Sequence, residues 1–281
     1  MIAFDSVAGL ARSLASARAV ELTSYTLHPG MVLGSLVAAA RRGATVRVRL
    51  DGDPVGGHAG ALYRANVAAV AALRSAGANA SLTGPREPVL HTKAALVDGV
   101  AWFDDRNWSG ALAEHVVRVD DPRAVAVTKA DALAREADVI EHAGSARLDV
   151  ESESFGTGSI YAALLRRAQA HLPTRLIVAG REAAEPHNGA ERACLARLGG
   201  LGVDVRVGDE RHHDLDEKFA VAADRAWTGS ANATYAGGAA GAQSDWGVAS
   251  GAAAFVSGIR TAFEANWSRA GVFSDPRARR C

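Results

Sequence analysis

The sequence predicts an α/β fold in which two similar halves each form a mixed, mostly parallel sheet flanked by helices. Three observations support this prediction. The chain has 281 residues and is 48% hydrophobic, which is enough for a substantial core. Strand-like and helix-like patterns alternate along it, as they do in repeated βα units with buried strands. The second half also repeats the outline of the first.

In the first half, hydrophobic periodicity assigns the elements in order. They are a strand at 19–27, a helix at 31–44, a strand at 45–51, a helix at 61–78, and strands at 80–84, 93–98 and 100–105. The strand at 45–51 shows period-two alternation. The two helices end at Gly43 and Gly77, because glycine readily adopts the left-handed conformation that closes a helix.

The second half shows the same alternation. Its predicted elements are a helix at 159–172, a strand at 175–180, a helix at 190–202, strands at 203–208, 218–224 and 225–230, and a helix at 256–270. Apolar strands separated by amphipathic helices again indicate βα units.

An internal repeat relates the two halves. At a constant offset of 125 residues, four identities fall in register: Gly77 on Gly202, Lys93 on Lys218, Trp102 on Trp227, and Asn107 on Asn232. Nearer the N-terminus the offset drifts to 130, where the segment from Val20 resembles the segment from Val150. We therefore expect two domains, at 1–145 and 146–281.

Charge and cysteine content restrict the function. Lysine plus arginine equals aspartate plus glutamate, at 31 each, so the net charge is zero and a broadly basic nucleic-acid surface is not expected. With two cysteines and no run of 18 apolar residues, the sequence favours a cytoplasmic protein without a stable membrane span. The histidines near residue 212 lack a second ligand pair at suitable spacing, so we expect neither a metal nor another cofactor.

One short segment concentrates residues that suit phosphoryl chemistry. It reads His91-x-Lys93-x4-Asp98, with Asn107 nine residues further on. Alternate residues of a strand face the same side, so His91 and Lys93 should point into one cleft. A neutral imidazole can attack phosphorus, and lysine and asparagine can donate to the non-bridging oxygens in the transition state.

Together with the repeat, this motif resembles the phospholipase D superfamily, the "HKD" phosphodiesterases. The likeness extends over both motif regions, over the strand-helix segment that precedes the first motif, and over the closing "GSAN…DWGV" pattern. It implies two halves packed about a pseudo-two-fold axis with the active site between them. It also implies metal-independent chemistry through a phosphohistidine, which water or an alcohol then attacks.

The resemblance suggests a role for each site residue. His91 corresponds to the nucleophile, Lys93 and Asn107 to phosphate ligands, and Asp98 to a motif member that is mainly structural. Glu114 lies where the superfamily often has an acidic residue that orients the histidine. The phosphate ligands implied for the second half are Lys218, Ser230 and Asn232.

The second motif departs from the superfamily pattern. Asp216 replaces the expected histidine and Ala223 replaces the expected aspartate. The general acid is therefore open between Asp216, a neighbouring histidine (His213 or His212), and no acid at all, which would restrict the enzyme to good leaving groups.

The favoured function is a phosphodiesterase, hydrolysing or transferring a phosphodiester of a phospholipid or small molecule. The alternatives are an endonuclease of the same superfamily and a catalytically degenerate phosphate-binding protein. Phospholipid and nucleic acid are not resolved as substrates from the sequence. A monomer is favoured over a homodimer, because the internal repeat already supplies a facing half.

Overall fold

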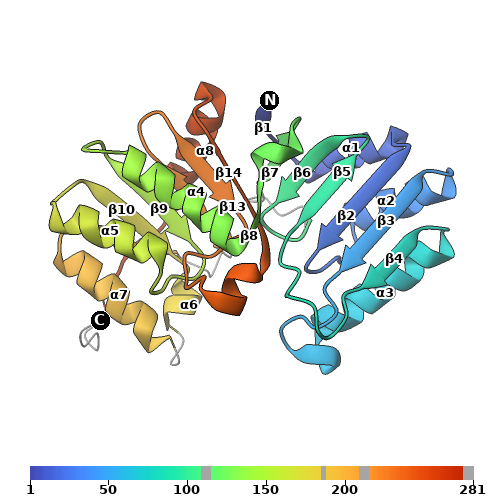
Figure 1. Ribbon diagram of the computed structural model, residues 1–281, viewed down its shortest axis with the longest axis horizontal. Coiled ribbons are helices and arrows are strands. Elements are labelled where there is room, and N and C mark those ends of the chain that lie inside the picture. The colour runs from blue at the N-terminus through green and yellow to red at the C-terminus, as the bar shows by residue number, and fades with distance from the viewer. Residues whose placement is uncertain (109–114, 185–187, 209–214, 275–281) are drawn as a thin grey trace. The chain divides into compact units, whose positions relative to one another are not determined.

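The computed structural model describes residues 1–108, 115–184, 188–208 and 215–274 (Figure 1). It confirms the predicted α/β fold of two mixed sheets flanked by helices. The expectation that each sheet is mostly parallel is wrong, because antiparallel pairs outnumber parallel pairs among the described strands of both sheets. The chain divides into two compact units, one of residues 1–128 with 242–246 and the other of 129–241 with 247 onward. This division differs from the expected boundary near residue 145, because helix α4 (Lys129–His142) packs with elements of the second unit.

The first unit contains the first sheet. Its elements are β1 (Ile2–Asp5), α1 (Val7–Ser16), β2 (Ala19–Ser24), α2 (Met31–Arg41), β3 (Thr45–Leu50), η1 (Gly57–Ala59), α3 (Ala61–Ser75), β4 (Asn79–Leu82), β5 (Ala94–Val97), β6 (Val100–Asp104), β7 (Val116–Val119), η2 (Pro122–Ala124) and β8 (Ala126–Thr128). Strands β2, β3 and β4 are parallel, and β5 joins β2 antiparallel. Strands β6, β7 and β1 continue the sheet as antiparallel neighbours.

The second unit follows the same plan. Its elements are α4, β9 (Leu148–Ser152), α5 (Ser159–Gln169), β10 (Thr174–Val178), α6 (Gly180–Ala184), α7 (Gly189–Gly200), β11 (Asp204–Val207), β12 (Phe219–Val221), β13 (Ala226–Gly229), η3 (Gly238–Ala242), β14 (Ser244–Ser250), α8 (Ala253–Trp267) and β15 (Gly271–Val272). The first three residues of β14 group with the first unit. Strands β9, β10 and β11 are parallel, and β12 joins β9 antiparallel.

The strand orders show the internal repeat directly. The first sheet runs β1-β7-β6-β5-β2-β3-β4, and the second runs β8-β14-β13-β12-β9-β10-β11 with β15 added at the β11 edge. Three parallel strands followed by an antiparallel meander therefore occur in both. The two halves predicted from sequence similarity thus have the same topology.

Local sequence explains several element ends. Gly77 and Gly202 have φ of +92° and +98° after helices α3 and α7, a conformation that side chains with a Cβ rarely adopt. The β5–β6 hairpin turns through Asp98 and Gly99, with φ of +47° and +90°, as expected for an Asp-Gly turn. Ser6 caps helix α1 by accepting a hydrogen bond from the Gly9 amide at 3.1 Å.

The core of the first unit follows the predicted alternation in β3. Val46, Val48 and Leu50 are buried, whereas the intervening residues of that strand are exposed. Helix α1 packs against α2, and both helices contribute buried residues to the core of this unit. Helices α1 and α4 are regular, although neither is among the elements predicted from the sequence.

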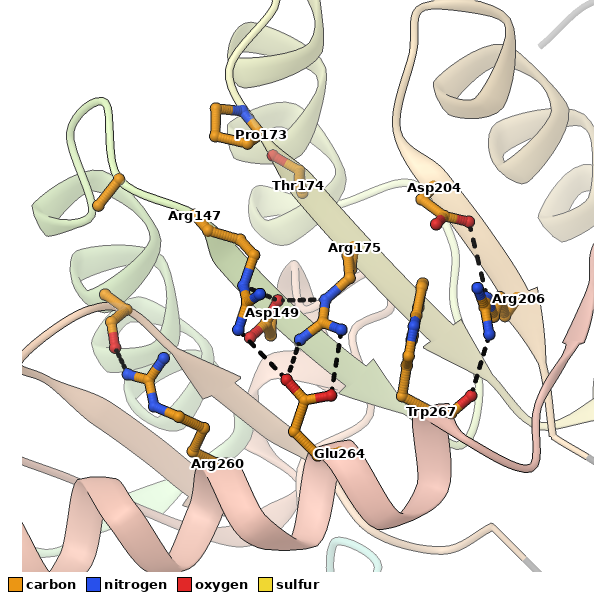
Figure 2. Close-up of polar contacts among 12 residues, drawn as sticks. Arg147, Asp149, Pro173, Thr174, Arg175, Asp204, Arg206, Arg260, Glu264 and Trp267 are labelled. Carbon is orange, nitrogen blue, oxygen red and sulfur yellow. Dashed lines mark hydrogen bonds and ion pairs between the residues drawn. The ribbon is translucent and has the colours of Figure 1, made fainter.

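In the second unit, α8 is held against the parallel strands by the arginine cluster of Figure 2. The Arg175 guanidinium lies 4.9 Å and 4.7 Å from the ring centroids of Phe263 and Trp267. It donates to Asp149 at 2.7 Å and to Glu264 at 2.6 Å. Burial alone would lower the pKa of Arg175, but these two hydrogen bonds outweigh it and raise the pKa above its usual range. Arg175 therefore stays positively charged and links α8 to the parallel strands through these contacts.

Within the described parts of the chain, no helix combines the length and the hydrophobicity that crossing a bilayer requires.

Candidate active site

The segment that carries His91 is anchored on both sides within the first unit. It lies just before β5, and the Leu90 amide donates to the Asp51 carboxylate at the end of β3, at 2.7 Å. On its other side, Leu90 forms a parallel bridge with Ser244, and the hydroxyl groups of Thr92 and Ser244 are 2.6 Å apart. The histidine backbone is therefore positioned by residues far away in the sequence.

His91 and Lys93 meet as their spacing predicted. Lys93 Nζ lies 3.3 Å from His91 Nε2, and the lysine side chain is buried. On the opposite edge of the ring, His91 Nδ1 lies 2.8 Å from Oδ1 of Asp245. The Asp245 side chain is 0% exposed and that of His91 is 20% exposed, so the imidazole edge remains within reach of a ligand.

These two contacts determine where the imidazole carries its proton. An ammonium group can only donate, so His91 Nε2 must accept from Lys93. The ring proton then resides on Nδ1 and is donated to the Asp245 carboxylate. A neutral histidine in this tautomer has its lone pair on Nε2, beside a cation. That is the arrangement that a nucleophilic imidazole needs for attack on an anionic phosphate.

Asp245 was not among the residues predicted from sequence. The orienting contact had been assigned to Glu114, which lies outside the described residues, as do His212 and His213. Asp245 belongs to the "DWGV" segment that supported the resemblance, and that segment was the available signal. Its role depends on a contact across 154 residues of sequence.

Asn107 lies in the turn after β6. The buried Asp104 carboxylate shapes this turn by accepting from the amides of Arg106 at 3.0 Å and Trp108 at 2.5 Å. Asn107 has φ of +65°, and its Oδ1 accepts from the Thr26 amide at 3.3 Å. Its Nδ2 makes no hydrogen bond to any residue that the structure describes. Because its Oδ1 atom already accepts a hydrogen bond from Thr26, Asn107 presents the two N–H donors of Nδ2 to a ligand.

Tyr25 connects these two parts of the site. It precedes Thr26, and its ring centroid lies 5.4 Å from that of His91 and 6.0 Å from Lys93 Nζ. Its hydroxyl accepts from the Val55 amide at 2.6 Å. Burial raises the pKa of Tyr25, so the phenol stays neutral beside the imidazole. Tyr25 is not among the site residues predicted from the sequence.

Asp98 lies elsewhere in the first unit. Its carboxylate accepts from the amides of Arg18 and Ala19, at 2.8–3.2 Å, where β2 begins. These hydrogen bonds lower the pKa of Asp98. The contacts of His91 and Lys93 lie near the other end of β2. Asp98 therefore joins the β5–β6 turn to the start of β2.

The second unit has its own lysine and asparagine pair. Lys218 Nζ and Asn232 Nδ2 both lie 3.1 Å from the same oxygen, Oε2 of Glu153. Lys218 is 2% exposed and also donates to the Asp216 carbonyl. Ser230 is buried. The second half thus brings its predicted lysine and asparagine together around a glutamate that the sequence analysis did not single out.

Among the described residues, no group of three histidine, cysteine, aspartate or glutamate side chains is placed to hold a metal ion. The donors at the first-unit site are the Lys93 ammonium and the Asn107 amide, which suit an oxyanion, and the Nε2 atom of His91 lies beside them as a nucleophile.

Comparisons with known proteins show which solved structures have a similar fold. No family model and no curated protein matches the sequence. Among solved structures, a phosphatidylserine synthase of Haemophilus influenzae aligns with a TM-score of 0.68 at 9% identity, over 97% of this chain and 87% of that one. A polyphosphate kinase of Porphyromonas gingivalis aligns with a TM-score of 0.63 at 13% identity, over 98% of this chain. The chain spans 50% of the length of that kinase.

A third structure, described as a phospholipase D family member, Nuc from Salmonella typhimurium, aligns over 54% of this chain at 15% identity with a TM-score of 0.46. We take the fold from the first two alignments, which extend over nearly the whole chain.

Proposed function

We propose, from the premise that this chain has the phospholipase D superfamily fold that its structural neighbours share, that its first half carries out phosphodiester chemistry through His91. The observation that supports this most strongly is the row Asp245–His91–Lys93, which places the imidazole lone pair on Nε2 next to a buried ammonium. That arrangement matches the needs of a nucleophile for a phosphate ester.

In the proposed first step, Nε2 of His91 attacks phosphorus and the ester oxygen of one substituent leaves. A phosphorus–nitrogen bond forms as a phosphorus–oxygen bond breaks, and the departing oxygen takes up a proton. His91 Nδ1 keeps its own proton, and Asp245 stabilises the positive charge that develops on the ring. Lys93 offsets the charge on the non-bridging oxygens, and Asn107 Nδ2 donates to one of them.

In the second step, water or an alcohol attacks the phosphohistidine. The attacking oxygen gives its proton to the group that protonated the leaving oxygen in the first step, the phosphorus–nitrogen bond breaks with its electron pair returning to Nε2, and His91 returns to its neutral form as the new ester or acid is released. Water gives hydrolysis and an alcohol gives transfer. Asp216, His213 and His212 stay predictions as proton donors to the leaving oxygen.

We favour a phosphodiester of a lipid or small molecule as the substrate. The neutral net charge of the chain supports this choice over a nuclease, which gains affinity from a basic surface. The neighbour with the higher TM-score of the two is named a phosphatidylserine synthase, which fits transfer of a phosphatidyl group as well as hydrolysis.

The test is hydrolysis of bis(4-nitrophenyl) phosphate in EDTA by the wild type and His91→Ala. Its good leaving group makes the assay insensitive to the identity of the proton donor. We expect turnover in the wild type that is lost in His91→Ala, with a 4-nitrophenyl phosphoryl group trapped on the wild-type protein after acid-free denaturation. Turnover that persists in His91→Ala would refute the proposal. Hydrolysis of a DNA duplex in preference to phospholipid vesicles would favour the endonuclease.

A further inference from the structure

Matching hydrogen bonds show which residues of the two halves are equivalent after the first parallel strand. In the first half, Ser24 Oγ donates to the Thr26 carbonyl at 2.7 Å, and the Thr26 amide donates to Asn107 at 3.3 Å. In the second half, Ser152 Oγ donates to the Ser154 carbonyl at 2.8 Å, and the Ser154 amide donates to Asn232 at 3.4 Å. The turns at 24–26 and 152–154 therefore have the same pattern of hydrogen bonds.

The equivalence places Glu153 where the first half has Tyr25, because each lies between the paired residues of its turn. This register differs by two residues from the offset of 130 that the sequence comparison indicated. A shift of two keeps every strand residue on its own face, so the apolar pattern fits both offsets equally well. The hydrogen bonds decide between them.

The substitution changes what the lysine and asparagine contact. In the first half, a neutral phenol occupies the position, and Asn107 Nδ2 has no partner among the described residues. In the second half, one oxygen of the Glu153 carboxylate receives both Lys218 Nζ and Asn232 Nδ2, each at 3.1 Å. A nearby anion stabilises a buried ammonium, because an uncompensated charge away from water is costly. Glu153 supplies that anion from within the chain.

We propose that the second half holds an oxyanion site in which the Glu153 carboxylate occupies the anion's position. An external oxyanion of the phosphate class would then bind Lys218 and Asn232 only after this carboxylate is removed or displaced. The choice of phosphate as the anion rests on the proposed function, whereas the presence of the site rests on the contacts of Glu153 alone.

The experiment is rescue of a Glu153→Ala variant by inorganic phosphate, measured as the midpoint of thermal unfolding. Removing the carboxylate leaves Lys218 without this counter-ion, so we expect a lower midpoint than in the wild type. Phosphate should then raise the midpoint of Glu153→Ala by roughly 5–10 °C more than it raises the wild type, once its concentration is about a hundred times its Kd. Potassium chloride at equal ionic strength should not reproduce this difference.

Two further variants make the result specific. In Glu153→Ala with Lys218→Met, both charges are gone and the additional phosphate effect should vanish. Glu141→Ala is the matched control, because Glu141 pairs with exposed Arg166 at 2.8 Å and its loss opens no buried site. Where Glu153→Ala fails to fold, Glu153→Ser replaces it, since the short hydroxyl side chain is polar and leaves the position of the carboxylate open.

Equal phosphate effects in the wild type and Glu153→Ala would overturn the proposal, as would an effect that survives Lys218→Met. The readout is independent of turnover. A failed His91 assay with a positive rescue would reject the proposed function only, and active enzyme without rescue would reject the oxyanion site only.

Discussion

Replacing Asp245 by asparagine should slow phosphorylation of His91 while leaving the protein folded. The carboxylate now accepts the Nδ1 proton at 2.8 Å, and an amide oxygen could still accept it. What disappears is the charge that stabilises the ring as it becomes positive. Hydrogen bonds to charged groups contribute about 1.5–3 kcal/mol, against about 1 kcal/mol for neutral ones. The difference of about 0.5–2 kcal/mol corresponds to a loss of roughly 2- to 30-fold in rate.

The loss should not be larger, because Lys93 opposes the wrong tautomer. If the asparagine amide turned to donate to Nδ1, the ring proton would move to Nε2 and point at the Lys93 ammonium, 3.3 Å away. Neither group could then accept from the other. The structure therefore predicts a moderate loss of rate, without a change of tautomer.

The assay is the pre-steady-state release of 4-nitrophenolate from bis(4-nitrophenyl) phosphate in EDTA, which isolates the first chemical step. Asp149→Asn is the matched control, because Asp149 is also 0% exposed and charge-paired but contacts Arg175 in the second unit. An unchanged rate in Asp245→Asn, with His91→Ala inactive, would refute the assigned role of Asp245. A loss beyond about a thousandfold would refute the role given to Lys93 in holding the tautomer.

Three further predictions concern Lys93 in the first unit and two carboxyl groups of the second unit, Glu136 and Glu264. Lys93→Met should lower kcat by about 100- to 1,000-fold in the same assay, since it removes one donor to the transition-state oxyanion; a change in KM alone would contradict this. Glu136 is fully buried with no hydrogen-bond partner among the described residues, and burial raises its pKa. The unfolded chain releases this proton at lower pH than the folded chain does, so the stability of the wild type falls as pH rises above the ordinary carboxyl pKa. Glu136→Leu should therefore have a larger free energy of unfolding in urea, by an amount that grows from about pH 5 to about pH 8. A difference in stability that does not change with pH would contradict this prediction. Glu264→Gln should lose about 0.5–1 kcal/mol at neutral pH, because the half-exposed carboxylate pairs with Arg175 at 2.6 Å. Since that hydrogen bond lowers the pKa of Glu264, the contribution is present above its unfolded pKa and disappears as pH falls through the folded one, so urea curves of the two proteins should converge in acid.

Local pattern was sufficient for most of the fold. In β3, Val46, Val48 and Leu50 face inward, and a glycine follows each of the helices α3 and α7. Each of these features depends on residues only a few positions apart, so it can be predicted from the sequence. The repeat of Lys93 and Asn107 as Lys218 and Asn232 likewise required no structure. Helices α1 and α4 were not predicted, and the packing of α4 with the second unit moves the division of the chain to residue 128.

From the sequence alone, the two-residue spacing was enough to predict that the side chains of His91 and Lys93 meet, although the structure places both residues just before β5 and outside it. The contact of Asp245 with His91 spans 154 residues of sequence and that of Glu153 with Lys218 spans 65, and both become visible only in the folded chain. Such contacts depend on which strand ends and turns the folded chain brings together, and no local periodicity records that. A carboxylate in the sequence says only that an anion is available, and the fold decides which cation or imidazole it contacts.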